Sequence, residues 1–229
     1  MLVEHWMTRN VITAGAGMSV IDAAETMRRK NIRQMPVLDA AGAVIGIVSD
    51  RDTRDAMPSK YLPGDAAARD GGGLLSLKVG DIMTPDPVCV APDTAMDATA
   101  QAIIKNKIGG LPVVEAGRLV GIITLMDVLR FLCSATGVAR GGPQFAFRLA
   151  TAPGPLAALL DDLRGRGLRL LSVLTCYDHA EAGFRHAYVR LQDTGGLDLA
   201  ELTEDLRSRY DLLFRIADGQ TVRFDRGPR

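Results

Sequence analysis

The chain has 229 residues, and its 27 Lys and Arg residues balance its 27 Asp and Glu residues, which excludes the excess of positive charge that nucleic-acid binding requires. Cys89, Cys133 and Cys176 are odd in number and lack metal-ligand spacing, a pattern typical of reduced, buried thiols in the cytosol. No leader sequence and no uncharged stretch of membrane-spanning length is found, so we expect a cytoplasmic protein without a membrane partner, built from two or three compact units.

The first half of the chain contains one pattern twice. Met7 corresponds to Met83 and Pro36 to Pro112, and both pairs are 76 residues apart. A solenoid needs more than two such units to bury their faces, so two copies predict a pseudo-twofold pair.

Each copy predicts strand, helix, strand, strand and helix. In the first copy these elements fall at 11–13, 19–30, 35–39, 43–48 and from about residue 50. In the second copy they fall at 88–90, 94–106, 111–115, 118–123 and 125–133. Ser19 and Thr94 are predicted to cap the first helices, and Ser49 and Thr124 the second ones.

This repeated pattern resembles the cystathionine beta-synthase (CBS) domain pair, or Bateman module. The motifs that carry the resemblance are Gln34-Met35-Pro36-Val37, Gly110-Leu111-Pro112-Val113, Gly46-Ile47-Val48-Ser49-Asp50-Arg51-Asp52 and Gly121-Ile122-Ile123-Thr124-Leu125-Met126-Asp127. The resemblance implies CBS repeats at 1–57 and 79–137, with two ligand sites between them. It also implies adenosine-containing ligands such as AMP, ADP, ATP or S-adenosylmethionine, with no resident cofactor.

A hydroxyl and a carboxylate recur three residues apart in Ser49-x-x-Asp52 and Thr124-x-x-Asp127. At the start of a helix, the hydroxyl could meet a phosphate and the carboxylate could accept both ribose hydroxyls. The same spacing also forms an ordinary capping box, which needs no ligand. Both interpretations stay open, although the recurrence in both repeats favours a nucleotide site.

The resemblance further implies that each site combines residues of both repeats. One site would join Thr124 and Asp127 to Ile12, Thr13, Arg33 and Gln34. The other would join Ser49 and Asp52 to Cys89, Val90, Gly109 and Gly110. Arg51 could reach a phosphate in the second of these sites, and Arg33 could do so in the first. Gly109 and Gly110 have no side chains with which to select a base.

Residues 58–78 are rich in Gly and Pro, which predicts a flexible linker between the repeats. The linker is either a passive tether or a loop that orders over bound nucleotide.

A third unit is predicted at 143–217, followed by a tail at 218–229. Its expected strands and helices alternate as βαββαβ, at 144–151, 156–164, 168–177, 185–192, 199–210 and 212–216, which is the ferredoxin-like order. The turn from Thr151 to Leu156 resembles the start of an ACT domain, a regulatory module that often binds amino acids at a dimer interface, but Ala152 replaces the acid or amide common in ligand-binding members. A packing or dimerising role for that turn is therefore preferred. The full arrangement, α+β overall, resembles the acetoin-utilization AcuB-type proteins.

These observations predict an adenine-nucleotide-binding regulatory homodimer that acts on an unidentified protein. A structural scaffold with degenerate nucleotide sites is the main alternative. An enzyme is a remote one, because His5, His179 and His186 are the only histidines and no acid has a second carboxylate or histidine in a coordinating pattern. We therefore assign no catalytic residue and no metal ligand.

Overall fold

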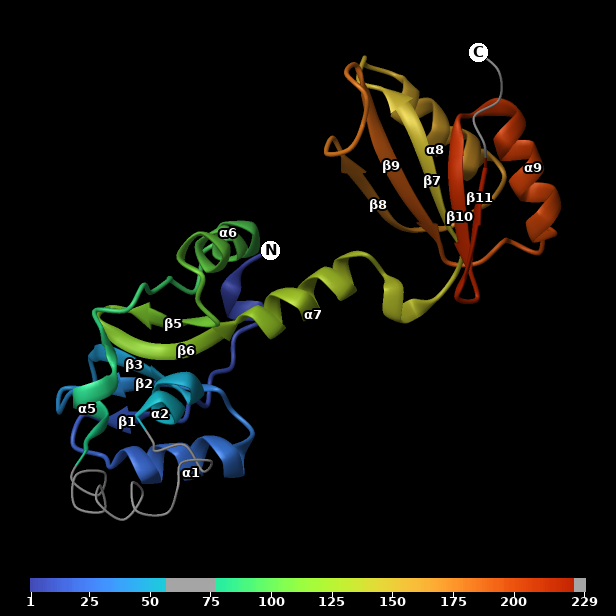
Figure 1. The fold of residues 1–229 in the computed structure, drawn as a ribbon. Coiled ribbons are helices and arrows are strands. Elements are labelled where there is room, and N and C mark those ends of the chain that lie inside the picture. Colours follow the sequence, from blue (N-terminus) through green and yellow to red (C-terminus); the bar gives the residue numbers. More distant parts are fainter. Residues whose placement is uncertain (57–76, 225–229) are drawn as a thin grey trace. The chain divides into compact units, whose positions relative to one another are not determined.

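The computed structural model describes residues 1–56 and 77–224, so all but the last two residues of the predicted linker at 58–78 lie outside the described part. The chain divides into two compact units, Met1–Leu129 and Arg130–Arg229, and the division falls within one helix (Figure 1). The architecture is mixed α/β in both units.

The first repeat follows the predicted order with small shifts. Its elements are the 3-10 helix η1 (Val3–His5), β1 (Ala14–Gly15), α1 (Val20–Lys30), β2 (Gln34–Leu38), β3 (Val44–Ser49) and α2 (Asp50–Asp55). Ser19 caps α1 as predicted, accepting a hydrogen bond from the backbone N–H of Asp22 at 3.0 Å. The strand expected at 11–13 is wrong by a few residues, because only Ala14 and Gly15 pair with β2.

The second repeat contains α5 (Val79–Ile82), β4 (Thr84–Pro85), α6 (Met96–Asn106), β5 (Gly110–Glu115), β6 (Arg118–Thr124) and α7 (Leu125–Ala135). The strand expected at 88–90 is wrong, since that segment contributes a single bridge from Val90 to Val113. The predicted Thr94 cap is also wrong. Its hydroxyl accepts from the N–H of Ala91 at 3.0 Å and so closes a turn, while α6 begins after Ala95 without a side-chain cap.

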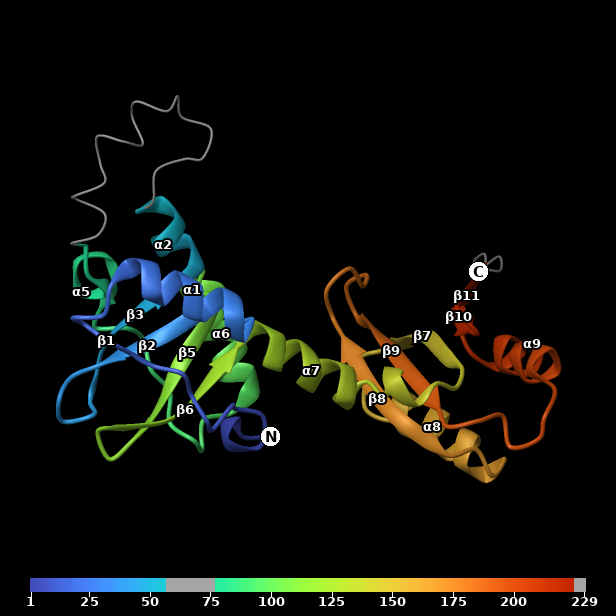
Figure 2. The ribbon, with the colours of Figure 1, turned by 90° about the horizontal axis from the view of Figure 1, so that it is seen from below.

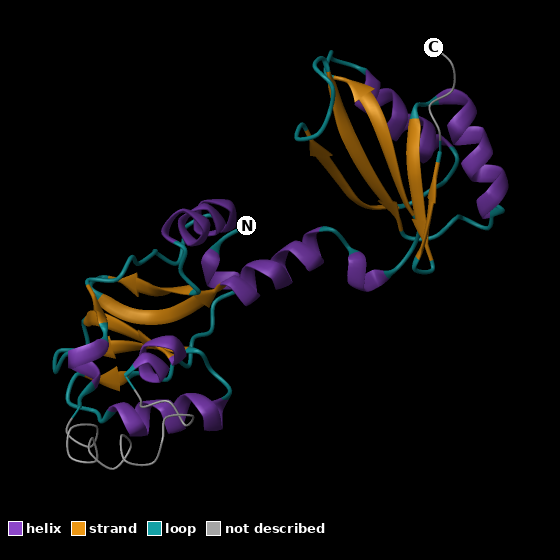
Figure 3. Ribbon diagram, in the orientation of Figure 1, coloured by secondary structure: helices purple, strands orange, loops and turns teal. Residues whose placement is uncertain are grey.

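The two repeats exchange their leading segments. The β4 strand of the second repeat pairs with β3 of the first in the sheet β1-β2-β3-β4, and Thr8 of the first repeat pairs with Ile122 in β6 of the second. Figure 2 labels the other strands of the first unit, and Figure 3 shows strands in orange and helices in purple. In each exchanged segment, a methionine packs against a glycine of the other repeat. A Cβ on Gly46 would clash with Met83, and a Cβ on Gly121 would lie 2.5 Å from the sulfur of Met7. A side chain at either position would therefore have to displace the methionine.

The same exchange recurs at the helix starts. Leu2 bridges to Ala95 and Lys78 bridges to Ser19, and these two contacts are related by the 76-residue offset. The equivalent residues Val3 and Val79 are both fully buried. The pseudo-twofold pair predicted from the repeat therefore describes the packing of the first unit.

The second unit is a five-stranded antiparallel sheet in the order β11-β10-β7-β9-β8. Its elements are η2 (Val138–Arg140), β7 (Gln144–Ala150), α8 (Pro155–Gly165), β8 (Leu170–Cys176), β9 (Phe184–Leu191), α9 (Leu199–Arg209), β10 (Leu212–Ala217) and β11 (Gln220–Arg223). The first six strands and helices after η2 keep the ferredoxin-like order. The predicted tail at 218–229 is wrong in part, because β11 pairs with β10 as an added edge strand.

The core of the second unit lies between the sheet and its two long helices. Phe145 and Phe147 of β7 pack with Leu159 of α8 and Leu206 of α9, so both helices cover the same face of the sheet. Pro155 occupies the first turn of α8, where its missing N–H has no consequence, as the sequence predicts.

The segment that follows α7 is fastened to this sheet. The hydroxyl of Ser172 donates to the carbonyl oxygen of Thr136 at 2.8 Å, and Arg190 donates to that of Gly142 at 3.0 Å. Arg190 is 9% exposed, so its bonds to carbonyl and amide oxygens hold a nearly buried cation in place. The end of α7 is thereby anchored within the second unit.

The cysteines do not lie where the sequence predicts. Cys89 and Cys133 are exposed and Cys176 is partly exposed, so the expectation of buried thiols is wrong. They lie at loops and on partly solvated faces rather than in the core, and core packing does not explain them. Across residues 1–56 and 77–224, no helix is both long and apolar enough to cross a membrane.

Candidate functional site

The first hydroxyl–carboxylate pair lies where β3 runs into α2. Ser49 accepts from the N–H of Asp52 at 3.3 Å, and the Oδ2 atom of Asp52 accepts from the N–H and the hydroxyl of Ser49, both at 2.7 Å. This is a complete capping box, and it forms because an extended Ser leads directly into the helix. The predicted cap is confirmed.

The second pair has the same geometry at the junction of β6 and α7. Thr124 accepts from the N–H of Asp127 at 3.3 Å, while Oδ2 of Asp127 accepts from the N–H of Thr124 at 2.9 Å and from its hydroxyl at 2.6 Å. Asp127 is 4% exposed. It is the more buried of the two carboxylates, so its hydrogen bonds are less screened by solvent.

This geometry limits what each pair can do for a ligand. Each hydroxyl hydrogen is already donated to the neighbouring carboxylate, so a phosphate could accept it only by displacing that bond. Within residues 1–56 and 77–224, Oδ1 of Asp52 has no hydrogen-bond donor, which leaves it available to ribose hydroxyls. The carboxylate role is therefore compatible with the box as it stands, whereas the hydroxyl role requires a rearrangement.

A row of four residues connects the two pairs across the repeats. Gln34 lies opposite Ser49 in the β2–β3 ladder, and Gly110 lies opposite Thr124 in the β5–β6 ladder. The side chain of Gln34 reaches the second repeat, where a Cβ on Gly110 would clash with its Nε2 atom and one on Gly109 would lie 3.6 Å from its Oε1 atom. Of the predicted partners, Gln34, Gly109 and Gly110 are thus brought together.

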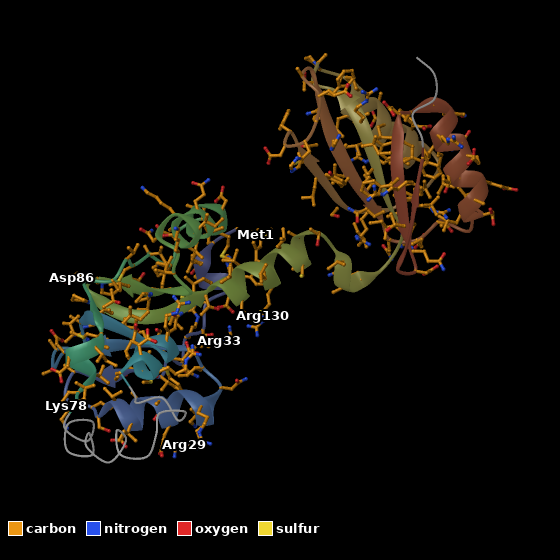
Figure 4. The ribbon with its side chains drawn as sticks, in the orientation of Figure 1. Met1, Arg29, Arg33, Lys78, Asp86 and Arg130 are labelled. Carbon is orange, nitrogen blue, oxygen red and sulfur yellow. The ribbon has the colours of Figure 1, made fainter. Side chains whose placement is uncertain are left out.

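Arg33 and Gly109 make equivalent backbone contacts, each to the first residue of the helix that follows. The carbonyl oxygen of Arg33 accepts from the N–H of Asp50 at 2.9 Å, and its side chain is exposed (Figure 4). Gly109 makes the equivalent contact, its carbonyl oxygen accepting from the N–H of Leu125 at 3.0 Å. Ile12 packs against the core of the first repeat, and Thr13 is exposed.

Cys89 and Val90 lie on the segment that leads into the second repeat. The Cys89 thiol donates to the carbonyl oxygen of Pro87 at 3.3 Å, and partial burial of the sulfur raises its pKa although the residue as a whole is exposed. Val90 donates to the carbonyl oxygen of Pro112 at 3.1 Å. These contacts hold the segment beside β5.

The two helix starts differ in charge. Arg51 is exposed in α2, and Arg54 forms an ion pair with Asp50 at 3.2 Å. In α7 the residues between the hydroxyl and the carboxylate are Leu125 and Met126, which are 46% and 55% exposed. The first turn of α2 therefore offers a cation to an anionic phosphate, whereas Leu125 and Met126 in the first turn of α7 offer none.

In the ranges 1–56 and 77–224, no three His, Cys, Asp or Glu side chains are grouped so that they could hold a metal ion. His5 lies near Glu4 at 3.9 Å on the surface, and His179 is exposed at the turn between β8 and β9.

The contact of the Gln34 amide with Gly110 is missed by sequence reasoning, which joins Gln34 to Thr124 and Asp127 but not to Gly110. The signal lies in the repeat itself: the 76-residue offset pairs a long amide side chain with a glycine. Such a large–small pair at equivalent positions is what a close approach across a pseudo-twofold axis requires.

Comparisons with known proteins agree with the geometry of the first unit. The CBS domain family profile matches residues 3–59 and 79–134. A CBS domain-containing protein of Dictyostelium discoideum is 32% identical over 132 residues, which make up 57% of this chain and 90% of that protein. The chain spans only 23 to 43% of three longer curated relatives.

Two solved structures match a similar share of this chain. CBSX2 from Arabidopsis thaliana has 28% identity and a TM-score of 0.51, covering 62% of this chain and 98% of the other. A protein described as a putative acetoin utilization protein (AcuB) from Vibrio cholerae has 31% identity and a TM-score of 0.50, covering 61% and 95%. CBSX2 has also been crystallised in complex with AMP.

Proposed function

The chain belongs to the CBS-domain family, and on that premise we propose that it is a regulatory protein that binds an adenine nucleotide between its two repeats. The observation that carries the proposal is the paired capping boxes at Ser49–Asp52 and Thr124–Asp127. They occupy equivalent positions, and the row through Gln34 and Gly110 connects them.

The proposed ligand is AMP, ADP or ATP, with S-adenosylmethionine as a further candidate. Carboxylates of the kind found here accept both hydroxyls of a ribose, and the exposed Arg51 favours an anionic phosphate group at the Ser49–Asp52 site. The AMP complex of CBSX2 agrees with this ligand class. The asymmetry of charge between the sites favours unequal occupancy.

The second unit is proposed as an ACT-like module that self-associates and transmits the state of the CBS pair within a cytoplasmic homodimer. Its ferredoxin-like sheet ends in β8, whose outer edge has no partner strand in the described chain and could pair with another copy. Because Ser172 and Arg190 anchor the segment that follows α7, a change at the start of α7 has a covalent, hydrogen-bonded route into this sheet. A ligand must bind one packing state better than the other for such transmission to occur.

A structural scaffold is the second candidate function. It is favoured by one specific observation: in both boxes the hydroxyl and the carboxylate already satisfy each other as helix caps. Ligand binding separates the two functions, and turnover of a bound nucleotide would instead support an enzyme.

A thermal-shift panel of AMP, ADP, ATP and S-adenosylmethionine on the purified protein tests the proposal. At a hundred times the dissociation constant, one bound ligand stabilises by about 2.7 kcal/mol, or roughly 5 to 10 °C for a unit of this size. Ribose 5-phosphate serves as a control that lacks the base. A flat panel at millimolar ligand, confirmed by calorimetry, would establish the scaffold instead.

A further inference from the structure

The side-chain amide of Gln34 lies where the two repeats meet. Gln34 begins β2 and Gly110 begins β5, and the 76-residue offset makes these positions equivalent. A Cβ on Gly110 would clash with Nε2 of Gln34 and would lie 2.9 Å from the carbonyl oxygen of Ile123. One amide therefore takes the space that two equivalent side chains would otherwise have to share.

The donor and acceptor atoms of the Gln34 side-chain amide are unpaired in the described structure. Gln34 is partly buried, and within residues 1–56 and 77–224 neither Oε1 nor Nε2 has a hydrogen-bond partner. A carboxamide carries two donor hydrogens and an acceptor oxygen, and leaving them unpaired in a partly buried place costs free energy unless water or a ligand pairs with them.

The amide lies beside Gly109 and Gly110. Nε2 is its atom nearest to Gly110, and Oε1 is its atom nearest to Gly109. Since Ile123 directly precedes Thr124, the amide lies beside the strand end that leads into the Thr124–Asp127 box.

We propose that Gln34 is the specificity-determining residue that selects adenine in the Thr124–Asp127 site, an inference that rests on the proposed nucleotide-binding function. Oε1 accepts a hydrogen bond from the 6-amino group of adenine, a pairing that glutamine uses when it reads adenine in nucleic acids. Hypoxanthine has an oxygen in place of that amino group. Its oxygen and Oε1 of Gln34 are both acceptors, so they cannot form this hydrogen bond. The equivalent residue for the other site is Gly110, which has no side chain, so the Ser49–Asp52 site discriminates less between the two bases.

Calorimetric titration of matched nucleotide pairs tests this role, with AMP against IMP, ADP against IDP and ATP against ITP. The parent protein is expected to prefer the adenine member by about tenfold or more at one site. Gln34→Leu keeps the size of the side chain over Gly110 and should bring that ratio close to one. Gln34→Glu keeps an acceptor for the 6-amino group and should retain the preference, a difference that a purely structural role does not produce. Gln101→Ala, an exposed glutamine on α6, is the control and should change nothing.

The possible failures are distinct. If the parent protein binds none of the six nucleotides, the proposed function and this inference both fall. If it binds them and Gln34→Leu retains the preference for adenine, only the inference falls. Circular dichroism of each variant shows whether it is folded, and an unfolded Gln34→Leu leaves the Gln34→Glu variant to decide, since loss of its preference would also refute the role.

Discussion

Replacing Asp127 tests whether the buried capping box is a nucleotide site. Asp127→Asn keeps an acceptor for the N–H of Thr124 but removes the charge, whereas Asp127→Ala removes both hydrogen bonds made by Oδ2. A charge-assisted hydrogen bond contributes about 1.5 to 3 kcal/mol, so nucleotide affinity at this site should fall by about ten- to a hundredfold in either variant.

The same two variants have separable effects on folding. Loss of a helix cap costs about 0.5 to 2 kcal/mol, so Asp127→Ala should lower the melting temperature by a few degrees and Asp127→Asn by less. Asp52→Asn is the matched change in the less buried box. Calorimetric titration measures the affinity, and thermal unfolding without ligand measures the stability.

One pattern of results would refute the ribose role of the carboxylates. If Asp52→Asn, Asp127→Asn and the double variant all bind nucleotide as tightly as the parent, then the carboxylates do not contact ribose and both boxes are only helix caps. A loss of stability without any loss of affinity would lead to the same conclusion.

Three further predictions concern other parts of the chain. Gly46→Ala and Gly121→Ala should each destabilise the first unit by about 1 to 3 kcal/mol in urea unfolding, because the methionine of the exchanged segment occupies the space of the new methyl group. Gly17→Ala is the control and should destabilise far less, because its methyl group would meet nothing within 4 Å. A hydrogen bond from Arg166 and ion pairing with arginine hold the pKa of Asp205 below its ordinary value. The contribution of Asp205 to stability is therefore present above the unfolded pKa of about 3.9 and is lost as pH falls through the folded pKa. Acid titrations of Asp205→Asn should show unfolding at a higher pH and a free energy of unfolding that depends less on pH. Removing residues 141–229 should weaken self-association measured by light scattering and ultracentrifugation, and an unchanged dimer affinity with a monomeric C-terminal fragment would contradict the role of the ACT-like module.

The sequence by itself determined the architecture of the first unit. The 76-residue offset and the alternation of apolar strands with amphipathic helices predicted two equivalent copies, and local capping chemistry predicted the boxes at Ser49 and Thr124. These features are local, because a serine followed three residues later by an acid can close its box with no help from distant residues. Thr94 shows the limit of such local patterns. Its hydroxyl accepts a hydrogen bond from the N–H of Ala91 and so closes a turn instead of capping α6.

Only the tertiary structure decided how the copies share their parts. The exchange of β4 onto β3, the methionines seated on Gly46 and Gly121, and the reach of Gln34 over Gly110 all join residues of different repeats. No periodicity encodes these contacts, because periodicity reports which face of an element is buried and not which partner buries it. The added strand β11 was missed for the same reason. Only Val222 of its four exposed residues is apolar, so the segment has no buried face to reveal it, and its pairing with β10 makes it a strand.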